Sequence, residues 1–115
     1  MSKGLSYNFF GTKGDIVATA SSLPSDPAVL MKNGWEDITP DGMKGTGHTL
    51  LSDTNTGLRI RFDKGVDGAN GFRGKDHYHI LNPNATSNKD MYLDENGDPV
   101  AKNSKKSHIL PKGGK

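Results

Sequence analysis

The stretch Leu58-Arg59-Ile60-Arg61-Phe62-Asp63 decides the fold class, because apolar and charged residues alternate along its whole length. Side chains at i and i+2 of a β-strand project from the same face, so the three apolar residues would face a core and the three charged residues the other side. This half-buried alternation is typical of a strand in an antiparallel sheet.

The segments on either side of this stretch extend the sheet. Residues 46–51 are joined to it by the turn-rich connection 52–57, which predicts a hairpin. Residues 64–74 contain four glycines and predict a loop over one edge of the sheet. Residues 75–81 predict the next strand, with Tyr78 and Ile80 on the core side.

A further hairpin and one clear helix complete the predicted elements. Residues 91–93 begin a hairpin that turns through Asn96-Gly97, a strong hairpin signal. Residues 26–34 predict a short helix, with an aspartate as N-cap, a proline at the first helical position and Asn33-Gly34 as a left-handed stop. Its inward face would be Val29 and Leu30.

Residues 15–20 are compatible with either a strand or a helix, and 35–39 predict a short extended segment. The sequence therefore predicts an α+β fold, in which a small N-terminal helix or helices pack on a twisted antiparallel β-sheet. At 115 residues the chain predicts a single domain, 1–115, with flexible ends at 1–14 and 110–115.

Composition excludes several classes of function. The chain has no cysteine, which removes thiol nucleophiles and cysteine-based zinc sites and favours a reducing compartment. No apolar run approaches the length of a membrane span, and no signal-peptide pattern begins the chain. Residues 102–115 hold five lysines and no acid, which suits either a polyanionic partner or a solvated tail.

His77 and His79 are the most informative residues for function, because they would stand side by side on one face of the strand 75–81. Three interpretations are open. The pair is structural; or it binds a metal, which needs further ligands such as His48, His108 or a carboxylate; or it performs general acid–base catalysis without a metal, for which histidine has a suitable pKa.

The acid–base interpretation matches RNA cleavage by internal transesterification. That reaction needs a base for the ribose 2′-hydroxyl, an acid for the leaving 5′-oxygen and cations for the phosphorane. Arg59 and Arg61 on the neighbouring strand supply guanidinium groups, although Arg61 also suits the solvated face of a strand. His108, after Ser107, adds a third imidazole.

The chain also resembles a known family over residues 34–109. The similar segments are Gly34-Trp35, Arg59–Gly65, Gly74–His79, Asn82-Pro83-Asn84, Tyr92–Val100 and Ser107-His108-Ile109. They look like the C-terminal toxin domains of bacterial polymorphic toxins, which end large carriers of the contact-dependent inhibition, Rhs and LXG types.

The resemblance implies a ribonuclease toxin of the barnase/EndoU/RelE-like class that cleaves RNA, plausibly tRNA. The toxin would be secreted or surface-bound on its carrier, would act in the cytoplasm of the target cell without a cofactor or metal, and would be blocked by a cognate immunity protein. The catalytic residues implied are His77, His79, His108, Arg59 and Lys64. The substrate-binding residues are Lys75, Asn82, Arg61 and Ser107.

Two alternatives remain open at this point. One is a metal-dependent DNase toxin, in which the His77–His79 strand and Asn82 form part of a ββα-metal-like site. The other is a non-enzymatic module of a surface protein that binds polyanions through the basic tail.

Overall fold

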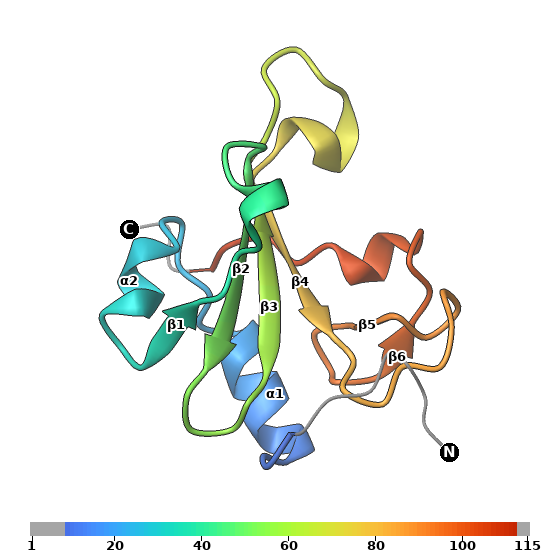
Figure 1. Ribbon diagram of the computed structural model, residues 1–115. Helices are drawn as coiled ribbons and strands as arrows, with labels where there is room; N and C mark the ends of the chain where they lie inside the picture. The colour runs from blue at the N-terminus through green and yellow to red at the C-terminus, as the bar shows by residue number, and fades with distance from the viewer. Residues whose placement is uncertain (1–8, 113–115) are drawn as a thin grey trace.

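The computed structural model describes residues 9–112 and has an α+β architecture, as the sequence predicts. Six antiparallel strands form one sheet in the order β1-β2-β3-β4-β5-β6, so each strand pairs with the next one along the chain (Figure 1). The strands are β1 Trp35–Asp37, β2 His48–Asp53, β3 Arg59–Asp63, β4 His77–Leu81, β5 Tyr92–Leu93 and β6 Pro99–Val100.

Two short helices precede the sheet. α1 (Lys13–Ala20) resolves the open interpretation of residues 15–20 as helical. It begins with a capping box, in which the Thr12 side chain accepts from the Asp15 backbone and the Asp15 side chain accepts from the Thr12 backbone. α1 passes behind the strands in Figure 1 and buries Ile16 and Ala20 against them.

α2 (Ala28–Met31) is shorter than the predicted helix at 26–34. The predicted cap is displaced by one residue, because Pro27 is the N-cap and has no side-chain capping bond; Asp26 precedes it, and its carboxylate accepts from the Ala28 backbone. Gly34 has the predicted left-handed conformation with φ +94°. Leu30 is buried as expected. The prediction for Val29 is wrong: with only about one turn of helix, a single side chain reaches the core, and Val29 is 39% exposed.

The hydrophobic core lies on one face of the sheet only. Tyr78 and Ile80 of β4 are fully buried there, as predicted, beside Ile60 and Phe62 of β3. The Tyr78 hydroxyl donates to the Pro24 carbonyl at 2.7 Å, which satisfies its polar atom inside the core. The charged and imidazole side chains of β3 and β4 therefore lie on the opposite face.

Within residues 9–112, two 3₁₀ turns lie between strands, η1 Asp41–Met43 and η2 Gly71–Gly74, and a third, η3 Lys105–Ser107, follows β6. η2 belongs to the predicted glycine-rich loop, which protrudes beyond the ends of β3 and β4 (Figure 1). After β6 the chain returns through η3 to β4, where Ile109 and Tyr78 exchange two backbone hydrogen bonds. This return brings residues 105–109 beside the first half of β4.

Residues 1–8 and 113–115 of the predicted flexible ends lie outside the described part of the chain. Within it, Lys13 begins α1, and the Lys112 backbone donates to the Leu23 carbonyl. Among residues 9–112, no helix has both the length and the apolar character needed to cross a membrane.

Candidate active site

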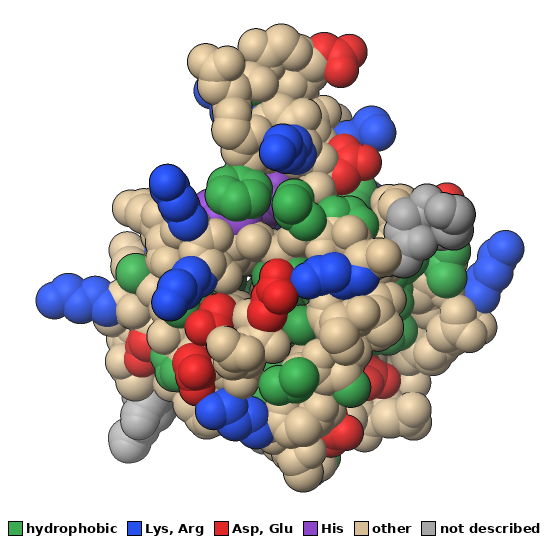
Figure 2. All heavy atoms as spheres, turned by 180° about the vertical axis from the view of Figure 1, so that it is seen from behind, with side chains coloured by type: hydrophobic (Ala, Val, Ile, Leu, Met, Phe, Trp, Pro, Cys, Tyr) green, Lys and Arg blue, Asp and Glu red, His purple; other side chains and the backbone are tan. Residues whose placement is uncertain are grey.

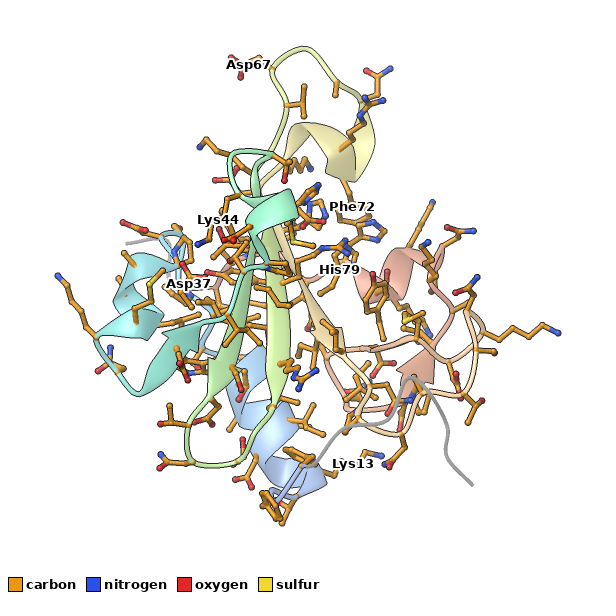
Figure 3. The ribbon with its side chains drawn as sticks, viewed as in Figure 1. Lys13, Asp37, Lys44, Asp67, Phe72 and His79 are labelled. Carbon is orange, nitrogen blue, oxygen red and sulfur yellow. The ribbon has the colours of Figure 1, made fainter. Side chains whose placement is uncertain are left out.

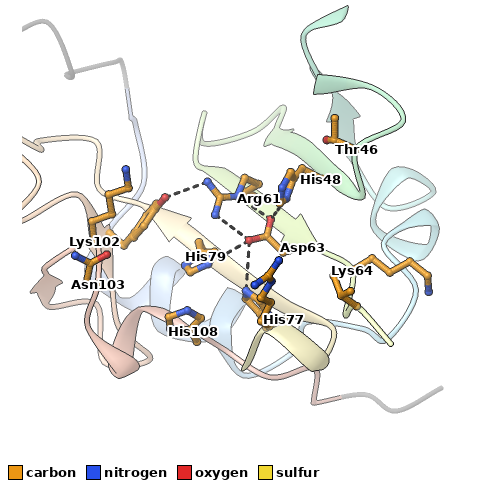
Figure 4. A pocket seen from close by; sticks show the side chains of 13 residues that line it. Thr46, His48, Arg61, Asp63, Lys64, His77, His79, Lys102, Asn103 and His108 are labelled. Atoms are coloured by element: carbon orange, nitrogen blue, oxygen red, sulfur yellow. Dashed lines mark hydrogen bonds and ion pairs between the residues drawn. The ribbon is translucent and has the colours of Figure 1, made fainter. Parts of the chain in front are cut away.

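The face of the sheet opposite the core carries a cluster of charged and imidazole groups around Asp63. Two nitrogens of Arg61 donate to its two carboxylate oxygens, at 2.7 Å and 2.8 Å. Nε2 of His77 and Nε2 of His79 each lie 3.3 Å from Oδ2, and Nδ1 of His48 lies 2.7 Å from Oδ1 (Figure 4). One buried carboxylate therefore organises four basic side chains.

Strand register produces this cluster. β3 pairs with β4 so that Arg61 stands opposite His79 and Asp63 opposite His77. β2 pairs with β3 so that His48 stands opposite Asp63 on its other side. Directly opposite residues share a face, so alternation places all of these side chains away from the core.

His108 reaches the cluster from the segment that follows η3. Its ring lies 5.0 Å from the ring of His77 and 4.7 Å from that of His79, and it stacks on Phe72 of the protruding loop at 4.6 Å. Its Nδ1 lies 3.1 Å from the Ser104 carbonyl. Figure 3 labels Phe72 in that loop and His79 on β4.

The environment of the cluster separates the protonation states of its members. Burial alone would raise the pKa of Asp63, but hydrogen bonds from His77, His79 and Arg61 hold it well below its ordinary value. Burial alone would lower the pKa of His77, but hydrogen bonds to Asp63 and to the Lys75 carbonyl raise it. Burial dominates at His79 and lowers its pKa.

The cluster forms one wall of an open cleft of about 440 Å³. Four cationic side chains and a single carboxylate line this cleft; the cations are Arg61, Lys64, Arg73 and Lys102. Seen from behind, a small area of histidine surface appears at the base of the protruding loop, beside lysine or arginine side chains (Figure 2). The excess of positive charge suits an anionic ligand.

The structure brings together five of the nine site residues predicted from the sequence. His77, His79, His108, Arg61 and Lys64 all line the cleft. Arg61, for which a merely solvated role was considered, also bonds the Tyr92 hydroxyl at 3.1 Å.

The other four do not line the cleft, although Ser107 Oγ lies 3.3 Å from Nδ1 of His108. Arg59 lies on the same face as Arg61 but two residues earlier in β3, and it does not line the cleft. Lys75 has an exposed side chain, and its carbonyl rather than its amine meets His77. Asn82 is buried and bonds the Asp90 carbonyl and the Asn84 backbone, and Ser107 is buried with its hydroxyl on the Ser104 carbonyl.

Eight residues that line the cleft were not among the predicted site residues: Thr46, His48, Asp63, Val66, Arg73, Tyr92, Lys102 and Asn103. Asp63 and Tyr92 lie at the centre of the hydrogen-bond network, and His48 closes one side of it. The sequence did contain a signal for Asp63, because it lies two residues after Arg61 and therefore on the same face of the strand. Tyr92 had no such signal, because β5 is only two residues long.

Comparison of the chain with protein-family models, with curated proteins and with solved structures found no match.

Proposed function

We propose that this protein is a metal-independent ribonuclease that cleaves RNA by general acid–base transesterification, with a barnase/EndoU/RelE-like arrangement of its helices and sheet. The observation that carries the proposal is the convergence of three imidazoles, one buried carboxylate and several cations in a single cleft. Pairs of titratable groups whose environments drive their pKa values apart are typical of acid–base sites.

His77 is the general acid of this proposal. Its Nδ1 donates to the Lys75 carbonyl at 2.9 Å, and its raised pKa favours the protonated ring near neutral pH. The Nε2–H lies 3.3 Å from Asp63, a long hydrogen bond that a leaving oxygen can replace. His77 would give this proton to the 5′-oxygen as the P–O bond breaks.

His108 is the general base. A carbonyl only accepts, so Nδ1 of His108 must carry its hydrogen toward Ser104, which leaves the lone pair of the neutral ring on Nε2. His108 is also the least buried of the three clustered rings. It would take the proton of the 2′-hydroxyl as that oxygen attacks phosphorus, giving a 2′,3′-cyclic phosphate and a free 5′-hydroxyl.

The remaining groups orient the catalytic histidines and stabilise the charge of the phosphorane. Asp63 orients His77 and His79 in the way that a buried carboxylate orients a catalytic histidine. Arg61, held by Asp63 and Tyr92, presents a fixed positive charge to the phosphorane, and Lys64 and Lys102 offer further cations along the cleft.

We propose further that the domain acts as an interbacterial toxin: delivered on a secreted or surface carrier, active on RNA such as tRNA in the target cytoplasm, and blocked by an immunity protein. Support comes from the segments that resemble polymorphic-toxin domains and from the cysteine-free composition, which suits a reducing cytosol. The basic cleft supports a polyanionic substrate.

Purified protein incubated with RNA in the presence of EDTA tests the chemistry. We expect cleavage to persist in chelator, to fail on a 2′-deoxy substrate, and to fall roughly 10²–10⁴-fold in His77→Gln and in His108→Gln. Lys44→Gln, an exposed lysine next to η1, is the matched control and should retain full activity. Activity that survives in both histidine variants, or that requires added metal after chelation, would refute the assignment.

Inducible expression in bacteria tests the biological role. Degraded tRNA with intact plasmid DNA, and growth restored by His108→Gln, is the expected outcome. Equal growth with and without the wild-type protein would favour the polyanion-binding alternative, and plasmid degradation would favour the DNase.

A further inference from the structure

The imidazoles of His77, His79 and His108 are close enough to share a single ion. One ring nitrogen of each lies within 4.8 Å of one ring nitrogen of each of the others. Tetrahedral coordination at 2.0–2.1 Å places ligand nitrogens roughly 3.4 Å apart, so the most distant pair would have to approach by up to about 1.4 Å. His108 belongs to a turn segment rather than to a strand of the sheet, and it can make that adjustment.

The second nitrogens of two rings are already engaged as they are in metal sites. Nδ1 of His77 donates to the Lys75 carbonyl, and Nδ1 of His108 lies against the Ser104 carbonyl. A hydrogen bond from the non-ligating nitrogen to a carbonyl or carboxylate orients a metal-bound histidine and fixes its tautomer. Nε2 of His108 then carries a lone pair, and Nε2 of His77 gains one when the ion displaces the proton shared with Asp63.

His79 provides an independent observation. Its ring is 3% exposed, and its Nδ1 is the one buried side-chain polar atom within residues 9–112 that has no hydrogen-bond partner. Its other nitrogen lies 3.3 Å from Asp63, in the carboxylate–histidine arrangement of metal sites. A buried nitrogen with no partner calls for an explanation, and an ion is one of the accepted ones.

We infer that His77, His79 and His108 bind one divalent transition-metal ion of the Zn²⁺ type. Three imidazoles favour zinc, cobalt or nickel over magnesium or calcium, which prefer oxygen ligands. The fourth position faces the cleft and is open to water or an anion. Arg61 and the cleft lysines repel a cation, and the negative charge of Asp63, which contacts two of the three rings, offsets part of that repulsion.

Such an ion would inhibit the proposed ribonuclease, because it takes up the lone pair of His108 and displaces the acidic proton of His77. Metal binding itself does not depend on the proposed function; only the inhibition does. Chelation would then raise, rather than lower, the cleavage rate of protein purified with trace metal.

Calorimetric titration with Zn²⁺, and visible absorption of the Co²⁺ form, test the site in the full chain at neutral pH. We expect one ion per protein, a tetrahedral cobalt spectrum, and an affinity at least tenfold weaker in His79→Gln and in His108→Gln. His48→Gln removes a histidine that also contacts Asp63 but is not one of the three proposed ligands, so it should lose less affinity than either ligand variant. Circular dichroism and thermal melting of each variant separate lost binding from lost folding.

The outcomes distinguish the inference from the proposed function. No binding to the wild type, unchanged binding in His108→Gln, or equal loss in His48→Gln overturns the metal site, whereas RNA cleavage in EDTA would still support the ribonuclease. Tight binding accompanied by inhibition supports both. Tight binding accompanied by a metal requirement for cleavage supports the site and refutes metal-independent catalysis.

Discussion

Replacement of Asp63 by asparagine removes the negative charge from the centre of the cluster while it keeps the shape of the side chain. Asp63 is 6% exposed and receives two hydrogen bonds from Arg61, together with contacts from His48, His77 and His79. An asparagine would leave Arg61 without a counter-charge in a largely buried position. We therefore expect Asp63→Asn to destabilise the fold as well as the site.

The size of this effect follows from the burial of the pair. Removal of one partner of a buried ion pair costs roughly 3–5 kcal/mol. The Arg61 side chain is 26% exposed, so water recovers part of that loss, and the amide oxygen can still accept one hydrogen bond. We expect the free energy of unfolding to fall by about 2–3 kcal/mol, and the melting temperature to fall by about 8–12 °C for a domain of this size.

Denaturant titration at several pH values is the assay. Folding lowers the pKa of Asp63, so its stabilisation is present above the unfolded value of about 3.9 and is lost as the pH falls below it. The gap between wild type and variant should therefore close in acid, and it should also narrow as the pH rises through the raised pKa of His77, because Asp63 stabilises the protonated ring. Asp67→Asn, at the exposed tip of the protruding loop (Figure 3), is the matched control. A gap below about 1 kcal/mol, or an equal loss in the control, would refute the central role of Asp63.

Three further predictions concern the core, the loop and the pH profile. Tyr78→Phe should lose about 1–2 kcal/mol of stability in denaturant titration without loss of cleavage, because the Pro24 carbonyl is left unbonded in the core. Gly74→Ala should weaken both stability and RNA binding, since an added Cβ would collide with the Ala69 carbonyl; Gly68→Ala meets no atom but has positive φ, and should cost less. The rate of cleavage against pH should fall as His77 deprotonates above its ordinary pKa of about 6.5, and Asp63→Asn should move that fall to lower pH.

Local pattern was enough to predict the sheet. The alternation in residues 58–63 correctly assigned every side chain of β3 to its face, and Asn96-Gly97 correctly predicted the last turn. The short helix at 28–31 was less predictable, because capping signals mark where a helix begins and ends but not how much of it packs. For this reason the sequence wrongly placed Val29 on the buried face of the helix.

The site depended on information that is not local. Arg59 and Arg61 have the same parity, so the sequence alone does not select between them; the choice is made by the register that sets Arg61 opposite His79. His108 enters only because the chain returns to β4 through the Ile109–Tyr78 bridge. For Asn82 a local alternative was visible, since Asn-Pro-Asn is a turn sequence and its side chain indeed closes a turn onto Asn84.

The return of residues 105–109 to β4 also means that the histidine cluster is completed late in the synthesis of the chain. His79 and His108 are separated by about 30 residues, which a ribosome adds in roughly 2–6 s at 5–20 residues per second. Throughout that interval the nascent sheet holds two imidazoles without the third. In the proposed ribonuclease, the general base would therefore be the last of the three imidazoles to join the site.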